Sequence, residues 1–296
     1  MANKVTVIVP TYNRGRHLEK TIPTYLQADV EKMILVDDCS TDLTAEIAMI
    51  LQKKYTNIQY LLQPVNMKQT AAKNRALAEN IETPYVYFGD DDSCLLPRTI
   101  DYLLETAEKE NADIVGCCAL YADEESDMDD LYEFIRRKAR IASNSHELGN
   151  ICYPESLNFS KLCCKPVRVP VCNACALVKT SVAKAVLYDT AYKGNAYREE
   201  TDFFLRAAEQ GAKIFYDSRG AQINLPMSLI GRTPTMRSRL RFHYYDIRNT
   251  CLMLYRHNWY LRKEYGYRHN RYLMCAGYVL RKMIRLSRKF MGMRVD

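Results

Sequence analysis

Three consecutive aspartates, Asp90, Asp91 and Asp92, are the most informative residues of this 296-residue chain. They follow an apolar and aromatic run at residues 85–88, whose composition is typical of a buried β-strand. Burial does not explain three carboxylates whose like charges repel. Because residues i and i+2 of an extended segment point the same way, Asp90 and Asp92 can converge on one cation. Oxygen ligands suit Mg²⁺ or Mn²⁺, which commonly bridge carboxylates to substrate phosphates; the alternative is a solvated acidic turn before Pro97.

Strands and helices that would position these aspartates alternate along the first 120 residues. We predict strands at residues 5–9, 33–36, 58–62, 85–88 and 113–118, and helices at 16–27, 43–54, 70–80 and 98–109. This alternation predicts an α/β fold with a mostly parallel sheet and helices on both faces. Ligands of such sheets bind at the carboxyl ends of strands, where the chain carries residues 10–13, 37–38 and 90–92.

The later part of the chain is less regular. Residues 121–160 are polar, and we expect one helix there at about 131–140. The chain should return to the sheet at residues 169–178 and 213–216, on either side of a helix at 199–210 that Gly211 ends.

The cysteine content and the hydropathy of the chain indicate the cellular compartment in which it works. The chain shows no signal peptide before residue 5, so its eleven cysteines suggest reduced thiols in a cytosol. Cys172 and Cys175, with Cys163 and Cys164 nearby, invite a zinc interpretation, but their apolar surroundings favour buried thiols. No uncharged apolar stretch is long enough for a transmembrane helix.

The net charge of +7 is unevenly distributed. Residues 232–296 contain 16 Lys and Arg against 3 Asp and Glu, whereas the rest of the chain is acidic overall. At about 100° per residue, one arc of a C-terminal helix would hold Tyr272, Leu273, Ala276, Val279, Leu280, Met283, Ile284, Phe290 and Met291, and the opposite arc Arg281, Lys282, Arg285, Arg288 and Lys289. This pattern predicts a helix lying on an anionic membrane surface; the alternative is a helix packed on the body with a solvated basic face.

With these pieces placed, the chain resembles the family 2 glycosyltransferases with a GT-A fold, over residues 4–226. Five motifs occur in the family's order: Val-Ile-Val-Pro-Thr-Tyr-Asn-Arg (7–14), Val-Asp-Asp-Cys-Ser-Thr-Asp (36–42), Ala-Ala-Lys-Asn-Arg (71–75), Gly-Asp-Asp-Asp (89–92) and Arg-Glu-Glu-Thr-Asp-Phe (198–203). Cys39 stands where Gly is usual, and Lys73 occupies the position of an Arg. A further segment, Tyr-Tyr-Asp-Ile-Arg-Asn (244–249), resembles a subset of the family whose acceptors are often lipid-linked or cell-surface polysaccharides.

The resemblance implies a metal-dependent hexosyltransferase or rhamnosyltransferase that uses a UDP- or dTDP-sugar and inverts the anomeric carbon. Carried over by position, the nucleotide would be bound by Pro10, Thr11, Tyr12, Arg14, Asp38, Lys73, Asp90 and Asp91. Mg²⁺ or Mn²⁺ would be bound by Asp92 and Asp90, with Asn224 at a position where family members often have a His. Glu200 aligns with the catalytic base.

The chemistry of the residues agrees with these roles. A leaving nucleoside diphosphate needs a cation for its developing charge, and the attacking hydroxyl needs a carboxylate to accept its proton. Glu199 and Glu200 precede an apolar helix whose N-terminus favours their ionised form. Asp202 can instead form an i,i+4 ion pair with Arg206. We therefore rank Glu200 first as the base, then Asp202, then Glu199.

We expect a catalytic domain at residues 1–231, with a nucleotide-binding half to about residue 120 and an acceptor half beyond it, followed by a basic amphipathic extension at 232–296. The expected partners are a nucleotide-sugar donor, a glycan or lipid-linked acceptor and an anionic membrane on its cytoplasmic face, and no nucleic acid. Two alternatives remain. A nucleotidyltransferase would need a Gly-rich basic loop after the first strand, and a nucleic-acid-binding protein would leave the acidic motifs unexplained.

Overall fold

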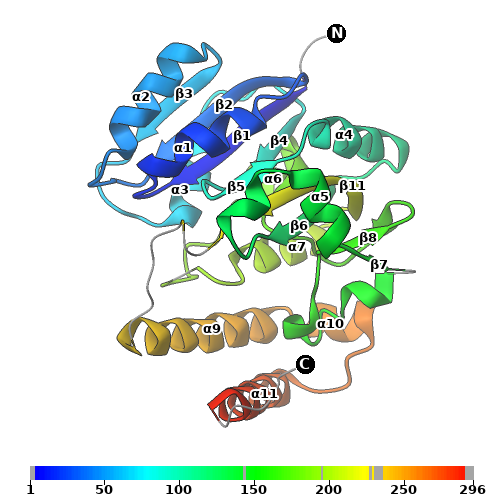
Figure 1. The fold of residues 1–296 in the computed structure, drawn as a ribbon. Helices are drawn as coiled ribbons and strands as arrows, with labels where there is room; N and C mark the ends of the chain where they lie inside the picture. The colour runs from blue at the N-terminus through cyan, green and yellow to red at the C-terminus, as the bar shows by residue number, and fades with distance from the viewer. Residues whose placement is uncertain (1–3, 143–144, 195, 227–228, 230–235, 291–296) are drawn as a thin grey trace.

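The computed structural model describes residues 4–142, 145–194, 196–226, 229 and 236–290. A large mixed sheet has the strand order β3-β2-β1-β4-β10-β6-β11-β5, β9 pairs with β11, and β7 pairs with β8 in a small separate sheet (Figure 1). The strands are β1 (Val5–Thr11), β2 (Val30–Asp37), β3 (Ile58–Leu62), β4 (Tyr85–Phe88), β5 (Ser93–Leu95), β6 (Ile114–Tyr121), β7 (Arg140–Ala142), β8 (Lys161–Cys163), β9 (Val167–Arg168), β10 (Ala176–Lys179) and β11 (Ile214–Asn224).

Helices connect these strands and continue after the last of them. They are α1 (Gly15–Thr21), α2 (Thr44–Lys54), α3 (Gln69–Leu77), α4 (Thr99–Lys109), α5 (Leu131–Lys138), α6 (Thr180–Val186), α7 (Glu199–Glu209), α9 (Met236–Arg256), α10 (Asn258–Tyr265) and α11 (Arg271–Phe290). Short 3₁₀ segments lie at Ile22–Tyr25, Glu125–Met128, Ser145–Leu148 and Pro154–Ser156.

The first four strands form the parallel half of the sheet, as predicted. β1 lies between β2 and β4, and Thr11 at its end pairs with Asp37 at the end of β2. All seven residues of β1 are buried because helices cover both faces of the sheet. The loops after β1, β2 and β4 therefore leave the sheet at one edge, where the predicted site residues lie.

Alternate residues of these strands belong to two different cores. On one face, Val7 and Val9 pack in a cluster with Leu18 of α1 and Leu103 of α4. On the other face, Ile8 packs in a cluster with residues of α3, α6 and α7, including Phe203. This second cluster extends into the C-terminal helices, which cover α7.

The structure differs from the sequence prediction at several elements. β10 runs antiparallel to both β4 and β6, so the sheet is parallel only in part. Within the segment predicted as a strand at 169–178, only the end is extended in the sheet, where β10 begins at Ala176. β5, which follows Asp92 directly, was not predicted because three residues carry no periodic signal. β11 continues to Asn224, well beyond the predicted end at residue 216.

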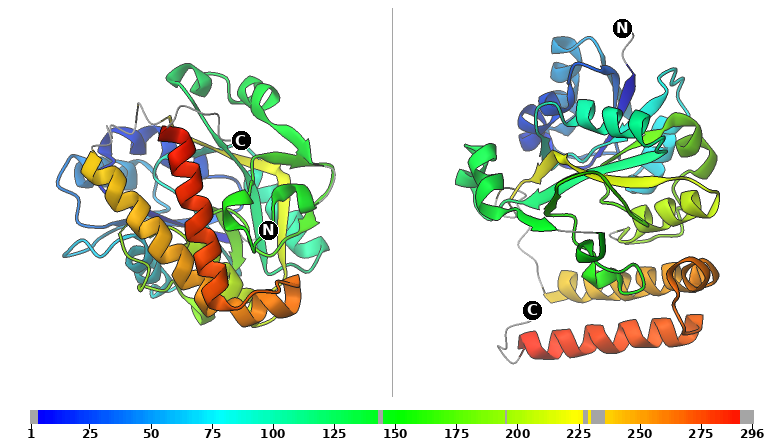
Figure 2. Two further views of the ribbon diagram at one scale, coloured as in Figure 1. Left: turned by 90° about the horizontal axis from the view of Figure 1, so that it is seen from below. Right: turned by 90° about the vertical axis from the view of Figure 1, so that its right-hand side faces the viewer.

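The C-terminal segment forms α9, α10 and α11 rather than one continuous helix. Gly266, with φ +65°, ends α10, and the Asn270 side chain accepts hydrogen bonds from the backbone N–H groups of Tyr272 and Leu273 at 3.1 and 3.0 Å. α9 lies beneath the sheet domain, and α11 lies beneath α9 as the outermost layer (Figure 2). The predicted division between residues 231 and 232 lies outside the described residues.

α11 packs on the body and also exposes apolar side chains. Met274 and Tyr278 are buried, and the buried Asp246 of α9 accepts a hydrogen bond from Tyr278 Oη at 2.6 Å and pairs with Lys282 at 2.5 Å. Arg281 pairs with Glu155. Five apolar or aromatic side chains of the predicted arc remain exposed: Tyr272, Leu273, Leu280, Met283 and Ile284. The helix therefore packs on the body, as the alternative interpretation expected, whereas docking on a membrane stays a prediction; Met291 lies outside the described residues.

Among the described residues, no helix combines the length and apolar character that a bilayer-spanning segment requires.

Candidate active site

The loops after β1 and β4 meet at the carboxyl edge of the parallel strands. Pro10 and Thr11 are buried at the end of β1, and the next residue, Tyr12, donates its backbone N–H to Asp91 Oδ2 at 3.3 Å. Arg14 Nε lies 3.6 Å from Asp91 Oδ1, and Arg14 Nη2 lies 3.8 Å from Asp92 Oδ2. The predicted nucleotide loop and the acidic segment are therefore joined through Arg14.

Asp38 organises the next loop along the edge. It is buried, and its carboxylate accepts hydrogen bonds from the backbone N–H groups of Met67 and Lys68, each at 2.7 Å, and from Gln63 Nε2 at 2.9 Å. These bonds hold the segment between β3 and α3 against the end of β2. The structure thus gives Asp38 a positioning role, whereas its predicted contact with the nucleotide stays a prediction.

Asp90, Asp91 and Asp92 lie together with an excess of negative charge. Partial burial and repulsion by Asp92 raise the pKa of Asp91 to about 7, against the influence of Arg14. Burial also raises the pKa of Asp90, while Lys73 and a hydrogen bond from Cys175 oppose the shift. A divalent cation bound at this strand end would reduce the repulsion between the carboxylates and favour their ionised forms.

The fit to a metal ion is incomplete within the protein itself. Among the described residues, no group of three His, Cys, Asp or Glu side chains is arranged to hold a metal. Asp90 and Asp92 can supply oxygens, and substrate phosphates commonly complete such a shell. Asn224 lies beside them, because it pairs with Ser93 in the β11–β5 ladder and Leu225 N–H donates to Asp92 O at 2.8 Å.

Lys73 and Glu199 form a buried ion pair next to the aspartates. Lys73 Nζ lies 3.0 Å from Glu199 Oε1, and both side chains are almost completely buried. Gln69, one turn before Lys73 on α3, donates to the same Glu199 oxygen at 2.7 Å. Burial opposes the charge on Lys73, but Glu199 raises its pKa well above the ordinary value, so the lysine stays protonated. Glu199 therefore acts as the counterion of Lys73, which makes it a poor candidate for the base.

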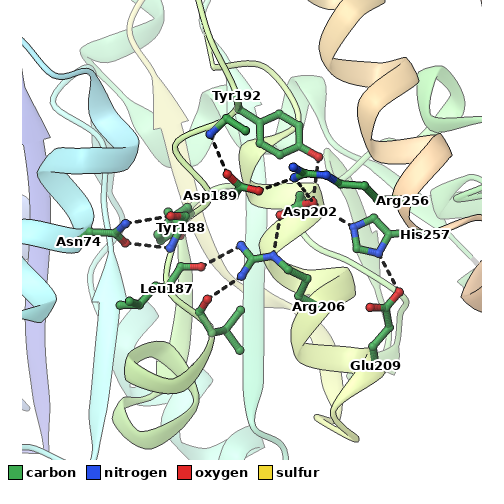
Figure 3. Close-up of polar contacts among 12 residues, drawn as sticks. Asn74, Leu187, Tyr188, Asp189, Tyr192, Asp202, Arg206, Glu209, Arg256 and His257 are labelled. Carbon is green, nitrogen blue, oxygen red and sulfur yellow. Dashed lines mark hydrogen bonds and ion pairs between the residues drawn. The ribbon is translucent and has the colours of Figure 1, made fainter.

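Tyr188 fixes the position of the Lys73 ammonium group. The ammonium nitrogen lies 4.6 Å from the centre of the Tyr188 ring, which stacks on Phe203 at 4.6 Å. Asn74 holds this segment through two hydrogen bonds of 2.8 Å with the backbone of Tyr188 (Figure 3).

Glu200 occupies the first turn of α7 and is partly exposed. Its charge helps to raise the pKa of both Asp90 and Lys73, which places it within electrostatic reach of both groups. It forms no hydrogen bond or ion pair with other described residues. Glu200 is thus the α7 carboxylate that remains available at this edge.

Asp202, two residues later, is fully engaged. Its side chain is completely buried, and Oδ2 accepts a hydrogen bond from Arg206 Nε at 2.7 Å (Figure 3). The other oxygen, Oδ1, accepts from Tyr192 Oη at 2.8 Å and lies 3.0 Å from His257 Nε2. The predicted i,i+4 pair with Arg206 is present, and Asp202 joins α7 to the start of α10.

His257 is held between two carboxylates of α7. Its Nε2 faces Asp202, and its Nδ1 lies 2.7 Å from Glu209 Oε1. Because both carboxylates are acceptors, the ring satisfies them only as an imidazolium with two N–H donors. Burial opposes this charge, but the hydrogen bonds to Asp202 and Glu209 raise the pKa of His257.

Four non-glycine residues with positive φ surround the edge: Asn13 (54°), Cys39 (63°), Lys68 (75°) and Arg198 (74°). Such backbone typically costs about 1–3 kcal/mol per residue and gathers at functional sites. The value at Cys39 also explains why glycine suits this position of the motif.

Sequence reasoning missed three residues around the site. Gln69 shares a helix face with Lys73 at i,i+4 spacing, a signal that could have revealed it. Cys175, a buried thiol, donates to Asp90 Oδ2 at 3.3 Å, and it reaches Asp90 only because β10 lies antiparallel beside β4. His257 is 55 residues from Asp202 in a segment without a motif, so no local pattern identified it.

Comparison with known proteins identifies a family. The model of "Glycosyl transferase family 2" matches residues 6–175, more than half of the chain. A GalNAc(5)-diNAcBac-PP-undecaprenol beta-1,3-glucosyltransferase of Campylobacter jejuni is 36% identical over 121 residues, which are 40% of this chain and 38% of the relative. This chain thus aligns with less than half of that relative.

Solved structures share the fold at low sequence identity. S. aureus TarS 1–349 in complex with UDP is similar with a TM-score of 0.55 and 17% identity, over 85% of this chain and 65% of that chain. The mannosyltransferase PcManGT of Pyrobaculum calidifontis, in complex with GDP-Man and Mn²⁺, has a TM-score of 0.55 and 15% identity, over 86% and 64% of the two chains.

Proposed function

This chain belongs to glycosyl transferase family 2, and on that premise we propose that it transfers a sugar from a nucleoside diphosphate donor, such as a UDP- or dTDP-sugar, to a hydroxyl of a glycan or lipid-linked acceptor. The family favours this activity over nucleotidyl transfer and nucleic-acid binding. The UDP and GDP-Man bound to the TarS and PcManGT structures support a nucleotide-sugar donor.

The meeting of Lys73, Asp90 and Glu200 at the carboxyl edge carries the proposal. The three residues come from α3, the loop after β4 and α7, and each influences the protonation of another. The protonated Lys73 is suited to stabilise a diphosphate leaving group. The available carboxylate of Glu200 is suited to act as a general base.

Asp90 and Asp92 are the residues that would hold Mg²⁺ or Mn²⁺, with the Asn224 amide close by. When bound, such an ion supplies positive charge that stabilises the diphosphate leaving group. Mn²⁺ in the PcManGT complex supports this proposal. Lys73, kept charged by Glu199, adds a second positive charge on the α3 side of the edge.

Glu200 is the proposed general base. It accepts the proton of the acceptor hydroxyl while that oxygen bonds to the anomeric carbon and the bond from this carbon to the diphosphate oxygen breaks. Attack from the face opposite the leaving group inverts the anomeric configuration.

Nucleotide-sugar screening tests this reaction. Incubation of the protein with a panel of UDP- and dTDP-sugars and Mn²⁺ should release the nucleoside diphosphate from one donor, and NMR of the product should show the inverted anomer. Retention of configuration would contradict the role of Glu200, and no release from any donor in the presence of a glycan acceptor would contradict the proposed activity.

We further propose that the protein works at the cytoplasmic face of a membrane, with α11 as the docking element. The name of the Campylobacter relative indicates an acceptor linked to undecaprenol, which supports a lipid-linked acceptor here. The exposed stripe of Tyr272, Leu273, Leu280, Met283 and Ile284, with the exposed Arg285 and Arg288 on the same helix, has the composition of an interfacial helix.

Substitution of exposed residues tests this docking without removing the buried Met274 and Tyr278. The Leu280→Ser/Ile284→Ser variant should bind vesicles that contain an anionic phospholipid about tenfold or more weakly, since each change removes apolar area worth about 1–2 kcal/mol. Leu43→Ser/Met49→Ser, at exposed positions near and on α2, is the matched control. Equal vesicle binding by both variants would contradict the docking proposal.

A further inference from the structure

A pocket of about 640 Å³ lies between α10 and the turn that leads into α11. Its lining includes Arg262, Lys263, Arg268 and Arg271 and two aromatic residues, Trp259 and Tyr267. No carboxylate belongs to this lining in the part of the chain that the structure describes.

The pocket is separate from the candidate active site. Phe242, near the start of α9, lies beside Tyr197 next to α7, with ring centres 6.4 Å apart. α10 begins beyond the other end of α9, which is roughly 20 Å farther along the helix axis at 1.5 Å per residue. The donor site therefore does not account for the cations of the pocket.

Two of these cations are unpaired within the part of the chain that the structure describes. Arg262 and Arg268 are exposed and form no hydrogen bond or ion pair with any described residue. Arg271 lies 4.6 Å from the Tyr255 ring centre, and Lys263 lies 5.2 Å from the Trp259 ring centre and 3.3 Å from Glu264. The C-terminal end of α10 attracts Arg262 and Lys263, but this attraction does not explain Arg268 and Arg271, which follow the helix.

The chemistry of the lining selects for a phosphate group. Guanidinium groups bind phosphate oxygens through paired hydrogen bonds, and four cations around one pocket repel each other until an anion enters. We propose that this pocket is a second ligand site of the protein, which binds a phosphate monoester or diphosphate. The ligand is either a membrane-lipid headgroup, since the exposed Tyr272 and Leu273 adjoin the pocket in sequence, or a soluble phosphate compound.

Calorimetric titration with inorganic pyrophosphate tests the site. The titration is done in EDTA, with the full chain and with the Arg262→Ala/Arg268→Ala variant, in which neither substitution removes a hydrogen bond or ion pair to another described residue. The control variant, Lys53→Ala/Lys109→Ala, loses the same charge at exposed positions on α2 and α4, which lie on the other side of the molecule from α10 (Figure 1). We expect pyrophosphate affinity to fall at least about tenfold in the pocket variant and to stay within about twofold of wild type in the control.

Vesicle flotation identifies the source of the phosphate. Wild type and both variants are mixed with vesicles of phosphatidylcholine alone or with phosphatidic acid. A loss of phosphatidic acid binding in the pocket variant identifies a lipid headgroup, whereas a loss confined to pyrophosphate identifies a soluble ligand. If the pocket and control variants bind both probes equally, or wild type binds neither, the inference is wrong. UDP binding with Mn²⁺ by the same variants should be unchanged, and it reports on the donor site independently.

Discussion

Helix α7 presents carboxylates to two regions that use them in opposite ways. At its first turn, Glu200 faces the aspartates and Lys73 and has no protein partner among the described residues. Behind that edge, Asp202 is completely buried, and its oxygens are occupied by Arg206, Tyr192 and His257. Both regions combine carboxylates with cations, so residue type does not distinguish them. The availability of a carboxylate oxygen separates a candidate catalytic group from one that stabilises the fold.

The largest expected effect is on the rate of transfer in the Glu200→Gln variant. This change keeps the size of the side chain and removes the basic oxygen, so kcat should fall about 10²–10⁴-fold. Donor affinity and melting temperature should match wild type, because the carboxylate holds no other described group. Initial rates, a donor titration and a melting curve on the same preparation check this.

The Asp202→Asn variant should show the reverse pattern. Loss of a buried charge that faces Arg206 and His257 should lower the free energy of unfolding by about 3 kcal/mol, while kcat of the folded fraction stays near wild type. Urea unfolding followed by circular dichroism, with rates measured well below the midpoint, gives both quantities. An inactive but stable Asp202→Asn protein, beside an active Glu200→Gln protein, would reverse the assignment.

A smaller effect concerns pH. The folded state raises the pKa of His257 through Asp202 and Glu209, so its stabilising contribution is complete below the ordinary histidine pKa of about 6.5. This contribution is lost as pH rises through the higher folded-state pKa. Arg256, which pairs with Asp189, also lies 3.9 Å from Asp202 and keeps its charge over this range.

The melting temperature of wild type should therefore fall as the pH rises from 6 to 9, and it should fall less steeply in the His257→Gln variant. Parallel curves for the two proteins would mean that His257 is not charged in the folded state.

The same contrast explains how far the sequence could predict the molecule. The parallel strands β1 to β4 were predictable because each contains a short, largely apolar run that is followed by polar residues at its carboxyl end. Asp90 and Lys73 were recognisable because their motifs lie within short segments of the chain. The direction of β10 was not predictable, since an apolar run reads the same in either direction, and so the contact of Cys175 with Asp90 was missed.

Contacts between residues that lie far apart in the sequence limited how much of the site could be predicted. The Asp202–Arg206 pair follows from helical spacing, whereas the His257 and Tyr192 contacts depend on how α9, α10 and the segment after α6 pack on α7. Glu199 was a candidate base by sequence position, and only its burial against Lys73 reveals it as a counterion. Helix α11 gave two competing interpretations because the pattern alone does not show which arc faces α9.

Binding of UDP with and without Mn²⁺ tests the central claim most directly. Isothermal titration of wild type and Asp92→Ala should show binding only by wild type and only with the metal, because the aspartates repel a diphosphate until a cation bridges them. Asp129→Ala, at an exposed position, should bind as wild type does. Equal, metal-independent affinities of wild type and Asp92→Ala for UDP would contradict a metal-assisted nucleotide site at this edge.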